Sequence, residues 1–194
     1  MRLNRERLVE IIPRSGTRVR TFTEGDIEEI FDIRIALEAL AVRRAAIRIE
    51  KAQLVRLRDT YERAETKLKN GDAKPALDFD TDMHRTILQA SGNERLQEMM
   101  IAINDCVTLF RNIGAGTPFH RGFNYRHREI LRALERRNPD LAARALSEHL
   151  EVAKTELFRD FKQRKLLEPT ELAPGQTKRA ARRANPFRRS TQSA

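Results

Sequence analysis

Apolar residues recur every three or four positions through most of the chain, which is the pattern of amphipathic α-helices. The spacing predicts six helices, over roughly residues 23–48, 51–69, 74–90, 94–112, 119–137 and 139–165. Short polar connections separate neighbouring helices, for example Asn70-Gly71 and Ser91-Gly92-Asn93. Because helices of this length joined by short connections pack against one another in antiparallel fashion, the predicted fold class is an all-α antiparallel bundle.

The first predicted helix has a clear start and a clear apolar side. The sequence Thr23-Glu24-Gly25-Asp26 is a capping box, in which the first and last side chains bond to each other's backbone N–H groups. The residues expected to face the core are Ile27, Ile30, Phe31, Leu37, Leu40 and Ala41. Arg34 falls within the same stripe, which is an unusual place for a guanidinium group.

The excess of basic residues lies at the two ends of the chain only. Six Arg and two Glu fall in residues 1–20, and residues 174–194 contain six Lys or Arg and no acid. The net charge of +10 therefore belongs to the ends, and residues 21–173 are neutral. A neutral body does not itself look like a nucleic-acid binder. From Pro169 onward the periodicity is lost, which predicts a disordered basic tail.

Other compositional features exclude several protein classes. The apolar runs are too short to span a membrane, and the N-terminus has no apolar signal-peptide core. A single cysteine, Cys106, cannot form an intramolecular disulfide, so a reducing, cytoplasmic setting is expected.

The heptapeptide Asp78-Phe-Asp-Thr-Asp-Met-His84 holds three acids at alternate positions before a histidine. In a helix, residues four apart share a face, whereas residues two apart point in nearly opposite directions. Asp80 therefore shares an apolar face with His84, together with Leu77, Ile87 and Leu88. Asp82 is expected to be solvated.

Three of the four histidines lie on apolar faces of three different helices: His84, His127 and His149. Only His120 has no such stripe around it. Each could be a satisfied core residue. Alternatively, all three converge with Asp80 on one metal ion, which would offset the cost of burying them. One carboxylate and three imidazoles suit Zn²⁺, Ni²⁺ or Mn²⁺ and leave coordination positions open.

Three segments closely resemble the signature segments of one family, the FCD (FadR C-terminal) ligand-binding domain of GntR-family transcription regulators. They are "IFDIRIALEALAVRRAA", "DTDMHRTILQASGN" and "HREILRALERRNPDLAARALSEHL". The resemblance covers roughly residues 23–165. It implies an all-α bundle in which Asp80, His84, His127 and His149 bind a divalent metal ion. Met83 stands where the family usually has Phe, a change that does not touch these four residues.

The N-terminal segment "RERLVEIIPRSGTRV" resembles the end of the GntR winged-helix domain, where the wing forms a β-hairpin. Ser15-Gly16 would supply the turn, and Arg7 replaces the usual Gly. The predicted organisation is a wing remnant over 1–22, an effector-binding helical domain over 23–168 and a basic tail over 169–194. Because the recognition helix is not in this sequence, Arg14 and Arg18 are expected to contact DNA phosphates only weakly, and operator binding belongs to a full-length form.

The resemblance implies a homodimeric regulator that senses a small organic acid through its metal ion. Two roles are open for Arg34: an ion pair with Glu38 one turn along the helix, or a fork for the effector carboxylate. Asn104 and Arg111 share one face of the fourth predicted helix and could line the same cavity. The alternative class is a metal-dependent hydrolase, but no proton shuttle or nucleophile motif accompanies the four candidate ligands, so the chain is not expected to be an enzyme.

Overall fold

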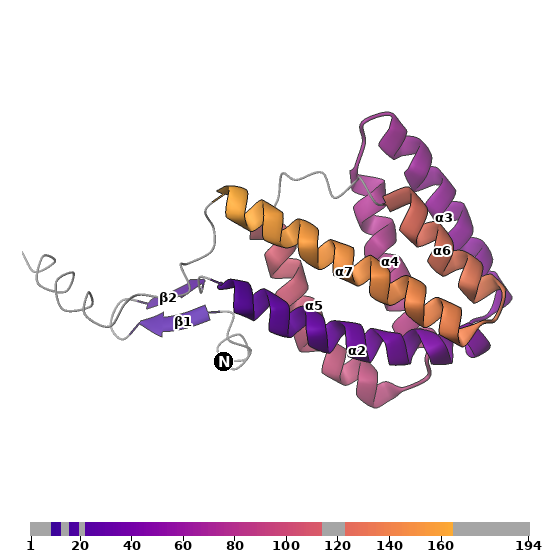
Figure 1. The fold of residues 1–194 in the computed structure, drawn as a ribbon, viewed down its shortest axis with the longest axis horizontal. Coiled ribbons are helices and arrows are strands. Elements are labelled where there is room, and N and C mark those ends of the chain that lie inside the picture. The colour runs from indigo at the N-terminus through magenta and orange to yellow at the C-terminus, as the bar shows by residue number, and fades with distance from the viewer. Residues whose placement is uncertain (1–8, 13–15, 20–21, 114–122, 165–194) are drawn as a thin grey trace, which may run out of the picture.

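The computed structural model describes residues 9–12, 16–19, 22–113 and 123–164. Two short strands, β1 (Val9–Ile12) and β2 (Gly16–Val19), precede six helices. The helices are α2 (Glu24–Arg48), α3 (Lys51–Lys69), α4 (Lys74–Ala90), α5 (Glu94–Ile113), α6 (Phe123–Glu135) and α7 (Pro139–Arg164). The predicted all-α bundle is confirmed, and the hairpin projects from one end of it (Figure 1).

The helix boundaries follow from local chemistry. The Thr23 hydroxyl accepts a hydrogen bond from the Asp26 backbone N–H at 3.1 Å, and the Asp26 carboxylate accepts one from the Thr23 backbone N–H at 2.8 Å. These two bonds complete the predicted capping box. Helix α6 ends at Glu135, two residues earlier than predicted, because Arg137 adopts a left-handed φ of 52°. The Asn138 side chain then caps α7 by accepting from the Leu141 N–H at 2.9 Å.

The hairpin at the N-terminus pairs β1 with β2 in antiparallel register, with Val9 opposite Val19 and Glu10 opposite Arg18. Arg14 lies outside the described residues, and so does the predicted tail over 169–194. Among the helices that the structure describes, none combines the length and the apolar character that a membrane crossing requires.

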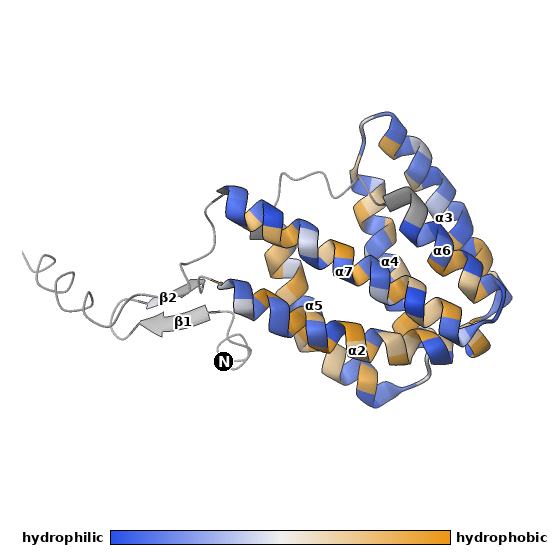
Figure 2. Cartoon of the chain, in the orientation of Figure 1, coloured by the Kyte–Doolittle hydropathy of each residue, from blue (hydrophilic) through white to orange (hydrophobic). Residues whose placement is uncertain are grey.

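Helices α2 and α7 run side by side and form the centre of the bundle, with α5 behind α2 (Figure 1). Helices α3, α4 and α6 lie at the end of the bundle away from the β-hairpin. A large apolar core joins all six helices, α5 through Leu96, Met100 and Ile103, and Figure 2 shows apolar residues along the helices. A smaller cluster around Phe31, Phe110 and Phe161 lies where α2, α5 and α7 meet.

The prediction that Leu40 of α2 faces the core is wrong. Leu40 is 46% exposed, whereas Phe31, Ala41 and Val42 are fully or almost fully buried. The buried side of α2 is therefore centred on Phe31, Arg34, Glu38 and Ala45, and Leu40 lies on the opposite side of the helix. Leu77 of α4, also expected on an apolar face, is 38% exposed.

Candidate metal centre

Four polar side chains from three helices meet inside the bundle. Asp80 and His84 lie one turn apart on the inner face of α4, His127 comes from α6 and His149 from α7. Each of the four is at most 6% exposed. The helical spacing deduced from the sequence is correct, because Asp80 and His84 are buried while Asp82 pairs with Arg56 and Arg85 on the outer side.

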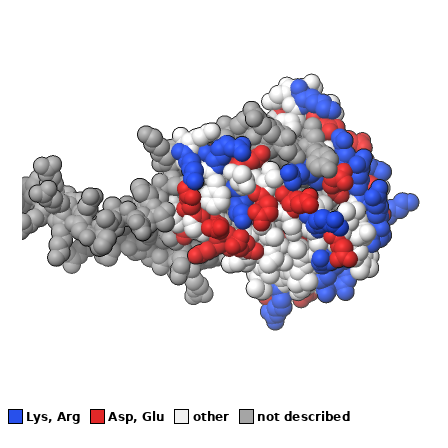
Figure 3. Space-filling model, viewed as in Figure 1, with Lys and Arg blue, Asp and Glu red and all other residues white. Residues whose placement is uncertain are grey.

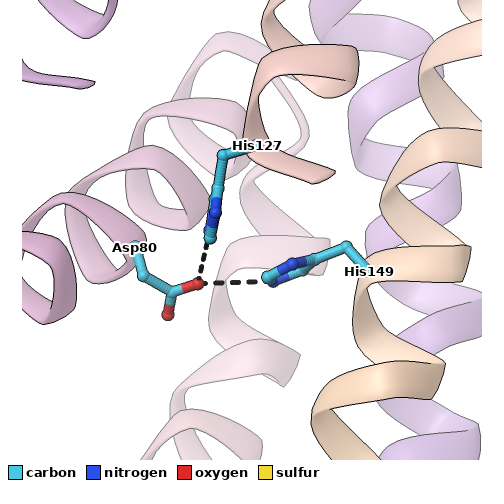
Figure 4. Close-up of side chains that lie close together, drawn as sticks. All are labelled: Asp80, His127 and His149. Atoms are coloured by element: carbon cyan, nitrogen blue, oxygen red, sulfur yellow. Dashed lines mark hydrogen bonds and ion pairs between the residues drawn. The ribbon is translucent and has the colours of Figure 1, made fainter. Parts of the chain in front are cut away.

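One carboxylate oxygen is the centre of this cluster. The Asp80 Oδ1 atom lies 3.0 Å from the Nε2 of His127, 3.3 Å from the Nε2 of His149 and 3.5 Å from the Nε2 of His84. Figure 4 shows the His127 and His149 rings pointing at this oxygen from two sides. The Nε2 atoms of His84 and His149 are 3.2 Å apart.

These distances suit a divalent cation. With Zn–N and Zn–O bonds near 2.0–2.1 Å, the ligand atoms of a tetrahedral site lie about 3.4 Å from one another. Asp80, His127 and His149 each offer a ligand atom within 4.8 Å of the others, and the His84 Nε2 borders this group. The donor set is the mixed nitrogen and oxygen set that Zn²⁺, Ni²⁺ and Mn²⁺ accept. The residues present therefore fit such an ion.

His84 is held from behind by a residue that the sequence reasoning did not assign to the site. Its Nδ1 atom bonds to Glu38 Oε2, and the other carboxylate oxygen of Glu38 accepts a hydrogen bond of 2.6 Å from Arg34 Nε. Glu38 is completely buried and Arg34 is 2% exposed. Of the two roles open for Arg34, the ion pair with Glu38 is present, and contact with an effector stays a prediction.

The ionisation of this chain of groups follows from its geometry. Burial alone would raise the pKa of Glu38, but the adjacent charges of His84 and Arg34 and their hydrogen bonds lower that pKa to about 2. The carboxylate is thus ionised and can only accept, so the His84 ring donates through Nδ1–H. Burial opposes a charge on His84 as well, yet Glu38 and Asp80 raise its pKa above the ordinary value.

His149 behaves in the opposite way. Burial outweighs the hydrogen bond to the Asp80 carboxylate and lowers the pKa of His149 to about 3, so this ring is neutral. The Nε2 atoms of His84 and His149 lie 3.2 Å apart and share one hydrogen bond. A cation that binds both nitrogens has to displace the proton between them, so its affinity should rise with pH.

Glu38 is expected to be a positioning residue for the ion. Its carboxylate fixes the Nδ1–H tautomer of His84 and so directs Nε2 toward Asp80. Replacing Glu38 by Gln keeps the shape but removes the charge, and should weaken Zn²⁺ binding by roughly 10- to 100-fold. Competition with a chelator of known affinity measures this, with Glu65→Gln, a partly buried acid of α3 that pairs with Arg128, as the control. Equal affinities for the native chain and Glu38→Gln would contradict the assignment.

Glu38 could have been found from the sequence by one signal only. It follows Arg34 by one turn on the buried side of α2, so a second buried charge was implied, but nothing in the sequence tied it to His84, 46 positions away.

The predicted effector and DNA contacts of three other residues stay predictions. Asn104 lies partly buried on α5, Arg111 is near the end of α5 but its side chain lies outside the described ones, and Arg18 is on β2.

Comparison with known proteins defines the class to which this fold and site belong. The FCD domain model matches residues 29–152, a stretch that contains Glu38 and all four candidate ligands. The chain belongs to the FCD domain family. The known proteins to which it is similar are GntR-family transcription regulators.

Two curated relatives have names of that kind. The chain is 32% identical over 136 residues to a "Probable D-xylose utilization operon transcriptional repressor" of Paenarthrobacter nicotinovorans, covering 70% of this chain and 59% of the relative. It is 25% identical over 150 residues to the HTH-type regulator YdhC of Bacillus subtilis, covering 76% and 66%. The chain thus spans about three fifths to two thirds of the length of these relatives. Both names describe transcription regulators, and neither describes a hydrolase.

Solved structures share the fold at lower identity. The structure of E. coli McbR/YncC superposes with a TM-score of 0.71 at 20% identity, covering 81% of this chain and 80% of that one. A structure described as the metal-free FCD domain of TM0439 superposes with a TM-score of 0.62 at 22% identity, covering 74% of this chain and 99% of that one. These likenesses establish the helical architecture.

Proposed function

We propose that the helical domain is the effector-sensing part of a cytoplasmic, homodimeric transcription regulator, and that it binds a small organic acid through a divalent metal ion. Asp80, His84, His127 and His149 would hold the ion. The observation that carries the proposal is the approach of three buried imidazole Nε2 atoms, from α4, α6 and α7, to within 3.5 Å of one Asp80 oxygen.

The charge of the site favours an anion. A divalent ion with one carboxylate and three neutral imidazoles carries a net charge of +1, and the buried Arg34–Glu38 pair adds nothing to it. A carboxylate entering an open coordination position would neutralise that charge. The Nε edge of Arg34 is taken by Glu38, and the terminal nitrogens of the same guanidinium would serve a second acidic or hydroxyl group of the effector. Asn104 and Arg111 are the further candidates for this role.

The regulatory part of the proposal concerns the full-length protein. Its DNA-binding domains would bind a two-fold symmetric operator, and the effector would change how the paired domains are placed. The hairpin of β1 and β2, with Arg18, would lie close to DNA phosphates.

Thermal unfolding with and without metal tests the proposal. The chain is stripped with a chelator, reloaded with Zn²⁺, Ni²⁺ or Mn²⁺, and mixed with malate, with lactate or with D-xylose as the uncharged sugar. Elemental analysis should find one ion per chain. Malate at a hundred times its dissociation constant should stabilise the loaded chain by about 2.7 kcal/mol, which is a rise in Tm of roughly 5–10 °C.

The stripped chain should show no such shift, and D-xylose should act on neither form. Equal stabilisation by malate with and without metal would refute the role of the ion. Stabilisation by D-xylose in place of the acids would refute the class of effector.

A further inference from the structure

Helix α2 is apolar on the side that faces away from the bundle as well as on the buried side. Ile33, Leu40 and Ile47 are 47%, 46% and 67% exposed. They are seven positions apart, which is almost two complete turns, so the three side chains form one straight stripe along the helix. Ala36 lies on the same side between the first two. The stripe spans about 21 Å of helix, at 1.5 Å per residue.

The molecular surface around this stripe has few charges. Figure 3 shows an uncharged area over the middle of α2, with acidic side chains gathered toward the N-terminal end of the helix. A contiguous apolar surface on a folded domain, with charged groups around it, is characteristic of a protein interface.

The charges of α2 are arranged in opposite senses at its two ends. The acids of its first third are Glu24, Asp26, Glu28, Glu29 and Asp32, and the bases of its last third are Arg43, Arg44 and Arg48. Two such helices placed parallel would bring like charges together, whereas two placed antiparallel about Leu40 bring Arg48 opposite Asp32 of the partner subunit at each end of the contact. The surface is therefore complementary to itself under a two-fold axis, as an isologous interface requires.

We infer that two copies of this chain meet through the outer face of α2, with the two helices antiparallel and the two-fold axis at Leu40. Ile33 and Ile47 lie at equal distances on either side of Leu40, so Leu40 meets the partner's Leu40 and Ile33 meets the partner's Ile47. An axis between Ala36 and Leu37 would place Ile47, the most exposed of the three, beside the partner's Asp26. This inference deepens the dimer in the proposed function and rests on it.

The basic C-terminal segment of the same chain is a poorer occupant. Residues 174–194 contain Phe187 as the only large apolar side chain, which cannot cover a stripe of three. The inner face of α2 carries Arg34 and Glu38, so the interface and the support of His84 share one helix.

Cross-linking tests the position of the axis. The native chain has one cysteine, Cys106, which is buried, so Cys106→Ser provides a clean background. In that background Leu40→Cys should give a covalent dimer with a short bis-maleimide. Val55→Cys, an exposed apolar position of α3, should not. Equal cross-linking of the two variants, or none with Leu40→Cys, overturns the inference.

Sedimentation of the full chain tests the interface independently of the metal. The native chain should be a dimer at tens of micromolar, Leu40→Glu should raise the dimer dissociation constant by more than about 30-fold, and Val55→Glu should leave it unchanged. A native monomer overturns the dimer and its interface together, while an Leu40→Glu variant that stays dimeric overturns only this face. One bound Zn²⁺ per chain in Leu40→Glu shows that the metal site is intact in either case.

Discussion

Replacing His149 by Ala should abolish stoichiometric metal binding and the stabilisation by acids together. His149 lies within 3.3 Å of the central Asp80 oxygen and within 3.2 Å of His84, so its loss opens one complete side of the donor set. The fall in Zn²⁺ affinity should exceed the roughly 10- to 100-fold typical of residues that only support a ligand. His84→Ala should have the same effect. Elemental analysis and thermal unfolding of the same samples provide the two measurements.

Helix α4 offers a matched pair of controls for this experiment. Asp80→Ala and Asp82→Ala remove the same group two positions apart, from opposite sides of one helix. Asp82 pairs with Arg56 and Arg85 near the surface, where ion pairs contribute little, so Asp82→Ala should keep both the metal and the thermal shift. If Asp82→Ala loses the metal while Asp80→Ala keeps it, the site is not where we place it.

Arg34→Met should destabilise the fold by about 3–5 kcal/mol, because it leaves the ionised Glu38 buried without its guanidinium partner. At this chain length that corresponds to a loss in Tm of roughly 6–20 °C. The depressed pKa of Glu38 sets the pH range. The stabilisation is present above the ordinary carboxyl pKa of 4.5 and is lost as the pH falls through about 2.

A second variant separates the ion pair from the metal site. Arg34→Met combined with Glu38→Leu removes both charges, so most of the lost stability should return, while metal affinity should stay low because His84 has no carboxylate behind it. Lys74→Met breaks a pair of the same spacing, Lys74–Asp78, on the exposed surface of α4 and should have no measurable effect. An Arg34→Met variant as stable as the native chain would show that the pair contributes nothing.

Local rules were enough for the helices and for one half of the site. The capping box at Thr23, the cap at Asn138 and the stop at Ser91-Gly92 act over a few residues, so the sequence determines them. The same holds for Asp80 and His84. The helical period alone places them together and turns Asp82 away, and the structure agrees.

Other features depend on which elements pack against one another. The sequence predicted that His127 and His149 face inward, but the packing of α6 and α7 on α4 decided that both meet the same Asp80 oxygen. The bond from Glu38 to His84 joins residues 46 positions apart, and no local rule specifies such a contact.

The exposure of Leu40 is a further feature that the sequence alone does not determine. Helix α2 carries apolar residues on more than one side, so its period cannot tell which stripe the bundle covers. The packing of α4, α5 and α7 buries the side with Arg34 and Glu38, and leaves Ile33, Leu40 and Ile47 outside. The sequence determined that α2 is a helix with apolar residues on more than one side. Only the tertiary structure decided which of these sides is core and which is surface, because burial depends on neighbours that lie far away in the chain.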